Sequence, residues 1–263
     1  MSCYTDLMIK FLLITILAYA LASLYLFIKQ RDLMYFPTPE ENHPDEEVWW
    51  LETDQQKLKI WVLKNSSKEN SPAIIYFGGN AETVENNIDD YRRMFAGYTV
   101  YITNYRGFGG STGTPTEKNL FADALTIYDQ VKAQHSRIQI IGRSLGSGIA
   151  CYVAAHRPVE KLALITPYDS ISNVAQSAYP LFPVKWLLKD HYDSMSYAPD
   201  IESDILIQIV NDDLVVTNKG SEIIAKALSH NKLKIERYYG VTHASVSDLS
   251  HFQNDLATFF SEE

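Results

Sequence analysis

A serine between glycines is the first candidate for chemistry. The sequence Gly142-Arg143-Ser144-Leu145-Gly146 has the form G-x-S-x-G, follows the apolar run IQII and precedes a helical pattern. A tight turn from strand to helix exposes the serine hydroxyl, and it needs glycines because neighbouring elements approach closely there. The N-terminus of the following helix favours negative charge. The motif predicts a nucleophile at Ser144, with a purely structural turn as the alternative.

A serine hydroxyl needs a base that accepts its proton. Of the 7 histidines, His243 lies in the loop YGVTH between the last expected strand and the last expected helix. We expect this histidine to be the base, and His191, after the run LALIT, is the second candidate. The other histidines lie in a connector or in and beside helices, where structural roles suffice: His43, His135, His156, His230 and His251.

The imidazole in turn needs a carboxylate that fixes its tautomer. The apolar run ILIQIV ends in Asn-Asp-Asp-Leu-Val-Val. We choose Asp213 because the apolar turn after it would hold it inward, whereas Asp212 is expected to cap or to face solvent. Asp169 is a third candidate. The chain order of serine, aspartate and histidine is that of α/β-hydrolases.

Acyl transfer also needs donors for the oxyanion. The run AIIYF leads into Gly78-Gly79-Asn80 ahead of a helix. Two glycines at a strand end allow backbone N–H groups to face a cleft, so we expect the N–H groups of Asn80 and Leu145 to form the oxyanion hole. An ordinary β-turn is the alternative.

Another glycine-rich loop, YRGFGGS at residues 105–111, does not match a phosphate loop. Thr112 stands where the third glycine of G-x-G-x-x-G would be, and the chain has no G-K-[ST]. We interpret the loop as structural, with Arg106 bonded to backbone carbonyls. Cys3 and Cys151 have no metal-binding spacing, and Cys151 fits the core of a helix. We therefore expect no metal and no organic cofactor.

Alternating strands and helices must position these residues. A half-exposed antiparallel pair is expected at 48–51 and 57–64, and a polar edge strand at 232–238. Compact apolar runs predict buried strands at 73–77, 99–103, 138–141, 162–166 and 205–210, and helical patterns occupy 82–95, 117–135, 145–157, 219–228 and 245–260. This order predicts a mostly parallel sheet with helices on both faces. Ligands bind such sheets beyond the carboxyl ends of the strands, where the candidate residues lie.

The N-terminus has a different character. From Phe11 to Ile28 no charged side chain occurs, and as a helix this stretch covers about 27 Å of a hydrocarbon core about 30 Å thick. We expect residues 1–32 to be an uncleaved single-pass membrane anchor, since the apolar run continues past the A-x-A-like site at 20–22; a cleaved signal peptide is the alternative. The flanking Lys10, Lys29 and Arg31 do not determine orientation.

Length and charge limit the remaining 33–263. A chain of 263 residues accommodates one α/β domain. Residues 1–32 carry three basic and two acidic side chains, so residues 33–263 carry 20 basic and 30 acidic ones, a net charge of −10. This charge argues against nucleic acid as a partner and means that charge cannot hold the domain to anionic lipid, so the helix must do the anchoring. An insertion at about 170–203 is too short for a large lid. Its apolar stretch 179–188 either packs on the sheet or lines an acyl pocket.

The combination of YFGGNAE, NYRGFGGSTGTPTE, IGRSLGSGIA, the NDD turn and the VTH loop resembles the α/β-hydrolase superfamily. Within it the chain is similar to membrane-anchored serine hydrolases of the bud-emergence-protein type, relatives of the prolyl oligopeptidase and serine aminopeptidase groups. The resemblance covers about 31–263 and implies an eight-stranded fold with Ser144, Asp213 and His243 as nucleophile, acid and base. Members usually carry His-Gly-Asn at the positions of residues 78–80, where this chain has Gly-Gly-Asn. The glycine at 78 leaves the backbone N–H donors intact, but it removes a side chain that could make the loop rigid.

The sequence therefore predicts a membrane-anchored serine hydrolase that cleaves an ester or thioester of a small or lipid-like acyl substrate. A peptidase or acyltransferase with the same triad is one alternative. A non-catalytic scaffold with the same fold is another, which a missing triad member would favour.

Overall fold

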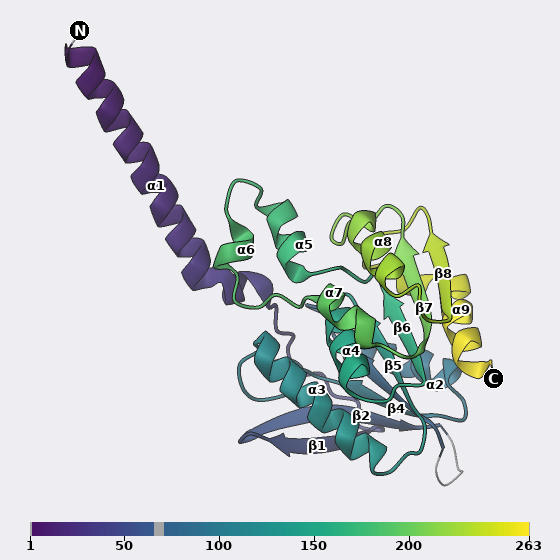
Figure 1. Ribbon diagram of the computed structural model, residues 1–263. Coiled ribbons are helices and arrows are strands. Elements are labelled where there is room, and N and C mark those ends of the chain that lie inside the picture. Colours follow the sequence, from purple (N-terminus) through teal and green to yellow (C-terminus); the bar gives the residue numbers. More distant parts are fainter. Residues whose placement is uncertain (1, 66–70, 263) are drawn as a thin grey trace.

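The computed structural model describes residues 2–65 and 71–262 of the protein. An N-terminal helix, α1 (Ser2–Met34), projects from a domain in which strands and helices alternate (Figure 1). The strands are β1 (Glu47–Thr53), β2 (Gln56–Lys64), β3 (Ala73–Phe77), β4 (Thr99–Thr103), β5 (Ile138–Arg143), β6 (Lys161–Ile165), β7 (Asp204–Val210) and β8 (Leu233–Tyr238). The helices are α2 (Ile88–Met94), α3 (Glu117–Lys132), α4 (Leu145–His156), α5 (Ile171–Ala178), α6 (Val184–Leu187), α7 (Ser194–Tyr197), α8 (Asn218–Ala227) and α9 (Ser250–Ser261), with short 3-10 turns at Val84–Asn87, Ala198–Asp200 and Val246–Asp248.

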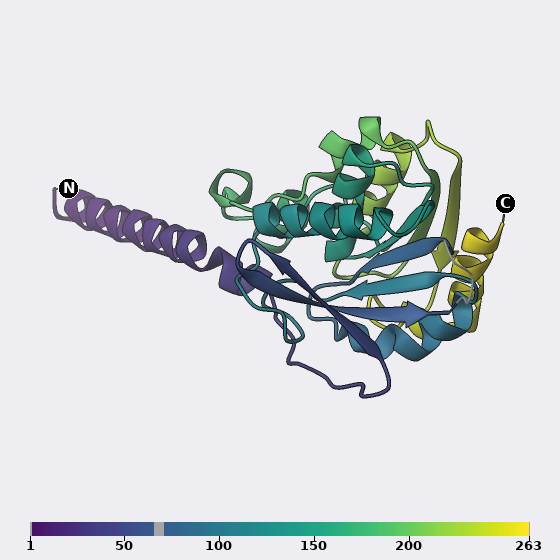
Figure 2. The ribbon, with the colours of Figure 1, turned by 90° about the horizontal axis from the view of Figure 1, so that it is seen from below.

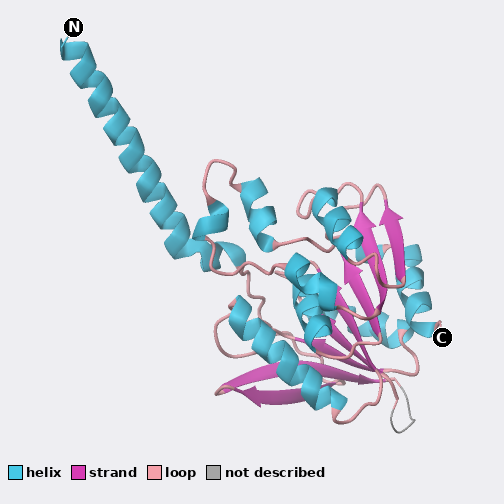
Figure 3. Ribbon diagram, viewed as in Figure 1, coloured by secondary structure: helices cyan, strands magenta, loops and turns pink. Residues whose placement is uncertain are grey.

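Within the described chain the strands form one 8-stranded sheet in the order β1-β2-β4-β3-β5-β6-β7-β8 (Figure 3). β2 pairs antiparallel with β1 and β4, and all pairs from β4 to β8 are parallel. The predicted fold class is confirmed, and β8 is the expected edge strand. The carboxyl ends of β3, β5, β7 and β8 consequently meet at one edge of the sheet.

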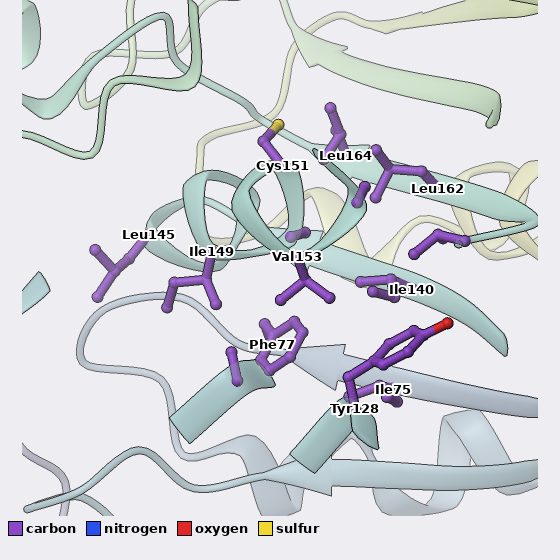
Figure 4. Close-up of a cluster of buried hydrophobic side chains, with 14 of the residues drawn as sticks. Ile75, Phe77, Tyr128, Ile140, Leu145, Ile149, Cys151, Val153, Leu162 and Leu164 are labelled. Atoms are coloured by element: carbon purple, nitrogen blue, oxygen red, sulfur yellow. The ribbon is translucent and has the colours of Figure 1, made fainter. Parts of the chain in front are cut away.

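Helices cover both faces of the sheet (Figure 2). On one face α3, α4 and α8 pack on alternate strand residues, and on the other face α2 and α9 pack on the residues between them. In Figure 4, Ile149 and Val153 of α4 lie on the side of that helix that faces Phe77 of β3. The thiol of Cys151 is free and buried in α4, as expected, and burial raises its pKa to about 12. The side chain of Cys3 lies outside the described part.

Several expectations need correction. β2 is not half-exposed, because Leu58 to Leu63 are all buried, and Lys59 reaches Glu40 with Nζ 2.9 Å from Oε1. The helices expected at 82–95 and 245–260 each begin with a 3-10 turn, and α1 continues two residues beyond the expected boundary.

Arg106 was expected to bond to backbone carbonyls, and this is wrong. Its guanidinium forms a buried ion pair with Asp123 of α3, with Nε 2.6 Å from Oδ2. A buried guanidinium needs a charged partner, and the carboxylate sits on α3, where sequence spacing could not reveal it.

Among the described residues, α1 is the one helix that is long and apolar enough to cross a membrane, and the domain does not bury its apolar stretch. The chain after it packs back on the domain through its apolar side chains. Tyr35 is buried, and its hydroxyl lies 2.8 Å from that of Tyr192.

Candidate active site

Ser144 stands at the turn between β5 and α4. Its backbone has φ 49° and ψ −115°, a conformation that costs a residue other than glycine about 1–3 kcal/mol. The turn can be this tight because Gly146 lets α4 approach β3. A Cβ on Gly146 would lie 2.0 Å from the carbonyl oxygen of Phe77. The hydroxyl is thereby held at the carboxyl edge of the sheet.

His243 and Asp213 reach the same edge from the loops after β8 and β7. His243 Nε2 lies 2.9 Å from Ser144 Oγ, and His243 Nδ1 lies 2.6 Å from Asp213 Oδ2. The other carboxylate oxygen of Asp213 accepts hydrogen bonds from the N–H groups of Val215 and Val216, at 2.7 and 2.9 Å. With Nδ1–H donating to Asp213, Nε2 is left as the acceptor that faces the hydroxyl.

The competing candidates lie elsewhere. Asp212 is exposed and accepts a hydrogen bond from the N–H of Gly240, whereas Asp169 is buried and accepts from the N–H of Ser170. The Nδ1 atom of His191 lies 2.8 Å from Ser172 Oγ, within the insertion. Hydrogen bonds therefore connect Ser144 to the preferred pair of residues and not to the second choices.

The two N–H groups expected to form an oxyanion hole belong to residues that line the cavity beside Ser144. Leu145 opens α4, so its N–H belongs to the first helical turn, which lacks intrahelical acceptors. The Asn80 loop lies beside the serine, since a Cβ on Gly79 would come within 3.6 Å of Ser144 Cβ. The side chain of Asn80 bonds to the carbonyl of Met34 and to the N–H of Phe36, which ties this loop to the end of α1.

The loop at residues 78–81, which was expected to carry an oxyanion donor, is held by Glu82, a residue that sequence reasoning missed. Glu82 accepts hydrogen bonds from the N–H of Gly79 and from the hydroxyl of Tyr76, and Tyr105 Oη donates to the carbonyl of Gly78 at 2.7 Å. These contacts hold the loop that lacks the usual histidine at position 78. The loop also ends in a positive φ of 58° at Ala81.

Arg143, the residue before Ser144, is the second residue that was missed. Its Nη1 lies 3.1 Å from Glu82 Oε1, and its Nη2 donates to the carbonyls of His243 and Ala244 at 3.2 and 3.1 Å. Burial alone would raise the pKa of Glu82, but the charge of Arg143 and the hydrogen bonds lower it. Burial disfavours the charged form of Arg143 too, yet the carboxylate of Glu82 raises the pKa of the guanidinium.

Ser144 opens into an apolar cavity of about 360 Å³, within the size range of small-molecule sites. Beside Ser144, the cavity is lined by Asn80, Leu145 and Tyr168. The rest of its walls come from three places: the end of α1 and the residues after it (Leu26, Gln30, Leu33, Met34, Phe36), the insertion (Ile171, Val174, Ala175, Ala178, Tyr179, Phe182, Val184, Leu187, Leu188), and the turn at Val215 and Val216. The apolar stretch 179–188 thus contributes to the pocket, and it also leaves the large side chains of Tyr179, Leu181 and Trp186 exposed. In the part of the chain that is described, no group of three His, Cys, Asp or Glu side chains is arranged to hold a metal ion.

Comparison with known proteins agrees with the fold. A family model described as alpha/beta hydrolase fold matches residues 72–193. The uncharacterized protein Rv2307c of Mycobacterium tuberculosis is 30% identical over 229 residues, which cover 81% of this chain and 82% of that protein. The lysophosphatidylserine lipase ABHD12 of Rattus norvegicus is 31% identical over 211 residues, which cover 69% of this chain and 52% of the lipase, so the match spans about half of that enzyme.

Solved structures share the fold at low sequence identity. The Pyrococcus furiosus esterase Pf2001 has a TM-score of 0.68 at 16% identity, covering 86% of this chain and 98% of its own. Est1E from Butyrivibrio proteoclasticus has a TM-score of 0.66 at 17% identity, covering 81% of this chain and 97% of its own.

Proposed function

The chain belongs to the α/β-hydrolase fold family and is a hydrolase, and from that premise we propose that it is a serine hydrolase, anchored in a membrane by α1, that cleaves carboxylic esters or thioesters. Ser144 is the proposed nucleophile, His243 the base and Asp213 the acid. One observation carries the proposal: Ser144 Oγ, His243 and Asp213 form a continuous hydrogen-bonded chain at the wall of an apolar cavity.

The proposed reaction has two halves. Ser144 Oγ attacks the acyl carbon while its proton passes to His243 Nε2, and the N–H groups of Asn80 and Leu145 stabilise the negative oxygen that forms. The tetrahedral intermediate then expels the alkoxide or thiolate, which takes the proton from His243. Water, deprotonated by His243, then attacks the acyl carbon of the acyl-enzyme; the bond to Ser144 Oγ breaks, the carboxylic acid leaves, and His243 returns the proton to Ser144 Oγ. Asp213 orients the imidazole and stabilises its charged form.

The cavity supports a lipid-like acyl substrate. Apart from Gln30 and Asn80, its lining is almost wholly apolar away from the serine, which suits an acyl chain better than a charged or peptide substrate. The lysophosphatidylserine lipases among the relatives point in the same direction. The position of α1 beside the cavity supports a membrane-tethered enzyme that acts on such molecules.

Purified full-length protein in detergent tests the proposal. We expect it to hydrolyse p-nitrophenyl esters with a rate that rises from acetyl to longer acyl chains, and to hydrolyse acyl thioesters. Ser144→Ala serves as the control for background hydrolysis. Preference for aminoacyl amides over all esters would contradict the proposed substrate class while leaving the nucleophile in place.

A further inference from the structure

The segment 179–188, which joins α5 to α6 and runs through it, lies along α1. Figure 1 shows α5, α6 and the loop between them rising beside the domain-proximal half of α1. The hydroxyl of Tyr19 donates a hydrogen bond to the carbonyl of Leu181 at 2.9 Å, and its ring stacks on Phe182 with centroids 5.3 Å apart. Tyr19 thus fixes how far along the helix this segment reaches.

That contact is far from the end of the apolar stretch. Tyr19 precedes Lys29 by ten residues, which is about 15 Å along a helix axis, or half of a hydrocarbon core about 30 Å thick. A helix tilted by about 40° would still separate the two levels by about 11 Å. If α1 spans a bilayer between Lys10 and Lys29, Leu181 lies inside the hydrocarbon layer.

The side chains of the segment change along α1 in the same order as the layers of a membrane leaflet, from apolar at the far end to residues typical of the headgroup boundary near the domain. At the Tyr19 level Leu181 is 81% exposed, and no part of the described domain covers it. Nearer the domain, Trp186 is 90% exposed. Its neighbour Leu187 marks its position along α1, because the carbonyl of Leu187 accepts a hydrogen bond from Gln30 Nε2 at 3.1 Å. Tryptophan is typical of the boundary between hydrocarbon and headgroups.

Lys185 is the one charged residue within the segment, and further charged side chains follow directly after its end. Lys189 Nζ lies 4.4 Å from the ring centroid of Phe27, and Arg31 Nε lies 2.8 Å from Asp190 Oδ2. Both pairs sit at the level of the last turns of α1, next to the domain. Lys185 reaches back to the domain, where it lines a hollow with Asn173. The segment therefore has a charged base and an apolar tip.

Most of the backbone of the segment is internally bonded, which matters in an environment without water, where unpaired N–H and C=O groups are costly. Pro180 and Pro183 have no N–H group to satisfy. Six of the eight backbone N–H groups of the segment donate to carbonyls within it or in α5: those of Tyr179, Phe182, Val184, Trp186, Leu187 and Leu188. Side chains supply further donors, as Gln176 Nε2 does to the carbonyl of Phe182 at 3.0 Å.

We propose that residues 179–188 enter the leaflet of the membrane on the side of the domain, with Leu181 about halfway through the bilayer and Trp186 near the headgroups. The acyl chains of the membrane lipids contact the exposed apolar side chains of this segment. The cavity beside Ser144 then lies between two elements that stand in that leaflet, α1 and the segment, so that a lipid ester reaches the serine without leaving the bilayer. The proposal rests on the membrane anchoring by α1 proposed above.

Depth-dependent quenching of fluorescence in the full-length protein tests whether residues 179–188 enter the membrane. A single cysteine carrying an NBD fluorophore is placed at Leu181, Trp186, Ile16 or Glu52 in a Cys3→Ser background, where the buried Cys151 stays unlabelled. The protein is reconstituted in phosphatidylcholine vesicles with nitroxide quenchers near the headgroup or near the chain end. Ile16 of α1 is the membrane control, and Glu52 on β1 is the water control.

We expect the deep quencher to reduce fluorescence at Leu181 as strongly as at Ile16, the shallow quencher to act most at Trp186, and neither to act at Glu52. Quenching at Leu181 no greater than at Glu52, with Ile16 quenched, overturns the proposal and leaves the anchor intact. The same result with the fluorophore shielded from aqueous iodide shows that a second copy of the chain covers the segment instead. An unquenched Ile16 overturns the anchor and this proposal together, while fluorophosphonate labelling of Ser144 on the same samples reports separately on the catalytic proposal.

Kinetics provide a second readout. Leu181→Asp and Trp186→Ser do not touch the cavity lining, so we expect unchanged hydrolysis of a soluble short-chain ester and a loss of kcat/KM on a long-chain ester embedded in vesicles. Trp50→Ser, an exposed tryptophan on β1, is the matched control and should change neither rate. Equal loss on both substrates, or loss on neither, contradicts the proposal.

Discussion

Glu82 Oε1 lies 3.1 Å from Nη1 of Arg143, the residue immediately before Ser144. This pair joins three loops of the candidate site, because Glu82 also holds the N–H of Gly79 and Arg143 holds the backbone carbonyl of His243. The proposed nucleophile, base and oxyanion donors are therefore fixed to one another by a pair of residues that need not touch the substrate.

Glu82→Gln should reduce both stability and activity. Removing one partner of a largely buried ion pair typically costs about 3 kcal/mol. Because the pKa of Glu82 is lowered in the folded protein from its ordinary 4.5, its contribution to stability is fully present above about pH 4.5 and is lost as pH falls through the lower folded value. Urea unfolding from neutral to acidic pH should show the gap between wild type and variant closing only below that point. An equal gap at every pH would show that Glu82 acts through packing, and the exposed Glu52→Gln is the control.

Asp213→Asn and Asp212→Asn form a matched pair. The first removes the acceptor for His243 Nδ1–H and should lower kcat by about 10⁴. The second changes an exposed carboxylate and should stay within about twofold of wild type, as surface changes usually do. A steady-state assay with a p-nitrophenyl ester measures both. Equal losses in the two variants would remove the assignment of the acid to Asp213.

Gly146→Ala should destabilise the fold through close packing of α4 on β3. Its Cβ would lie 2.0 Å from the backbone oxygen of Phe77, which cannot move without breaking the sheet, so we expect a cost of about 3 kcal/mol or more. Gly97→Ala is the control: it has φ of 97° and no neighbour within 4 Å, so it should cost about 1 kcal/mol from backbone strain alone. Urea midpoints compare the two. A smaller effect at Gly146 than at Gly97 would contradict the tight turn.

Ala175→Phe should shorten the accepted acyl chain. Ala175 lines the cavity, whereas Ser177 on the same helix is exposed and lies outside its lining, so Ser177→Phe adds the same ring elsewhere. We expect kcat/KM of Ala175→Phe to fall at least about tenfold for long-chain esters and to change little for the acetyl ester. Parallel losses for all chain lengths would show that the acyl chain binds in another place.

The sequence predicted the sheet and the edge at which the candidate residues meet, because buried parallel strands are compact apolar runs and G-x-S-x-G marks a strand-to-helix turn. It did not reveal Glu82 and Arg143 as a pair, since they are distant in the chain and meet only after β3 and β5 lie side by side. The alternation in β2 suggested an exposed face, but the residues around Glu40 cover it and neutralise Lys59. The contribution of α1 to the cavity has no local signal at all, because it depends on how the insertion folds back on the helix.

Covalent labelling of Ser144 tests the central claim most directly. A fluorophosphonate probe reacts only with a serine whose proton is taken by a neighbouring base, so the account predicts labelling of the full-length wild type, a single modified peptide that contains Ser144, and no labelling of Ser144→Ala. Intact-mass and peptide mass spectrometry measure this without knowledge of the natural substrate. A folded wild type that stays unlabelled, or a Ser144→Ala variant labelled as strongly as wild type, would contradict it.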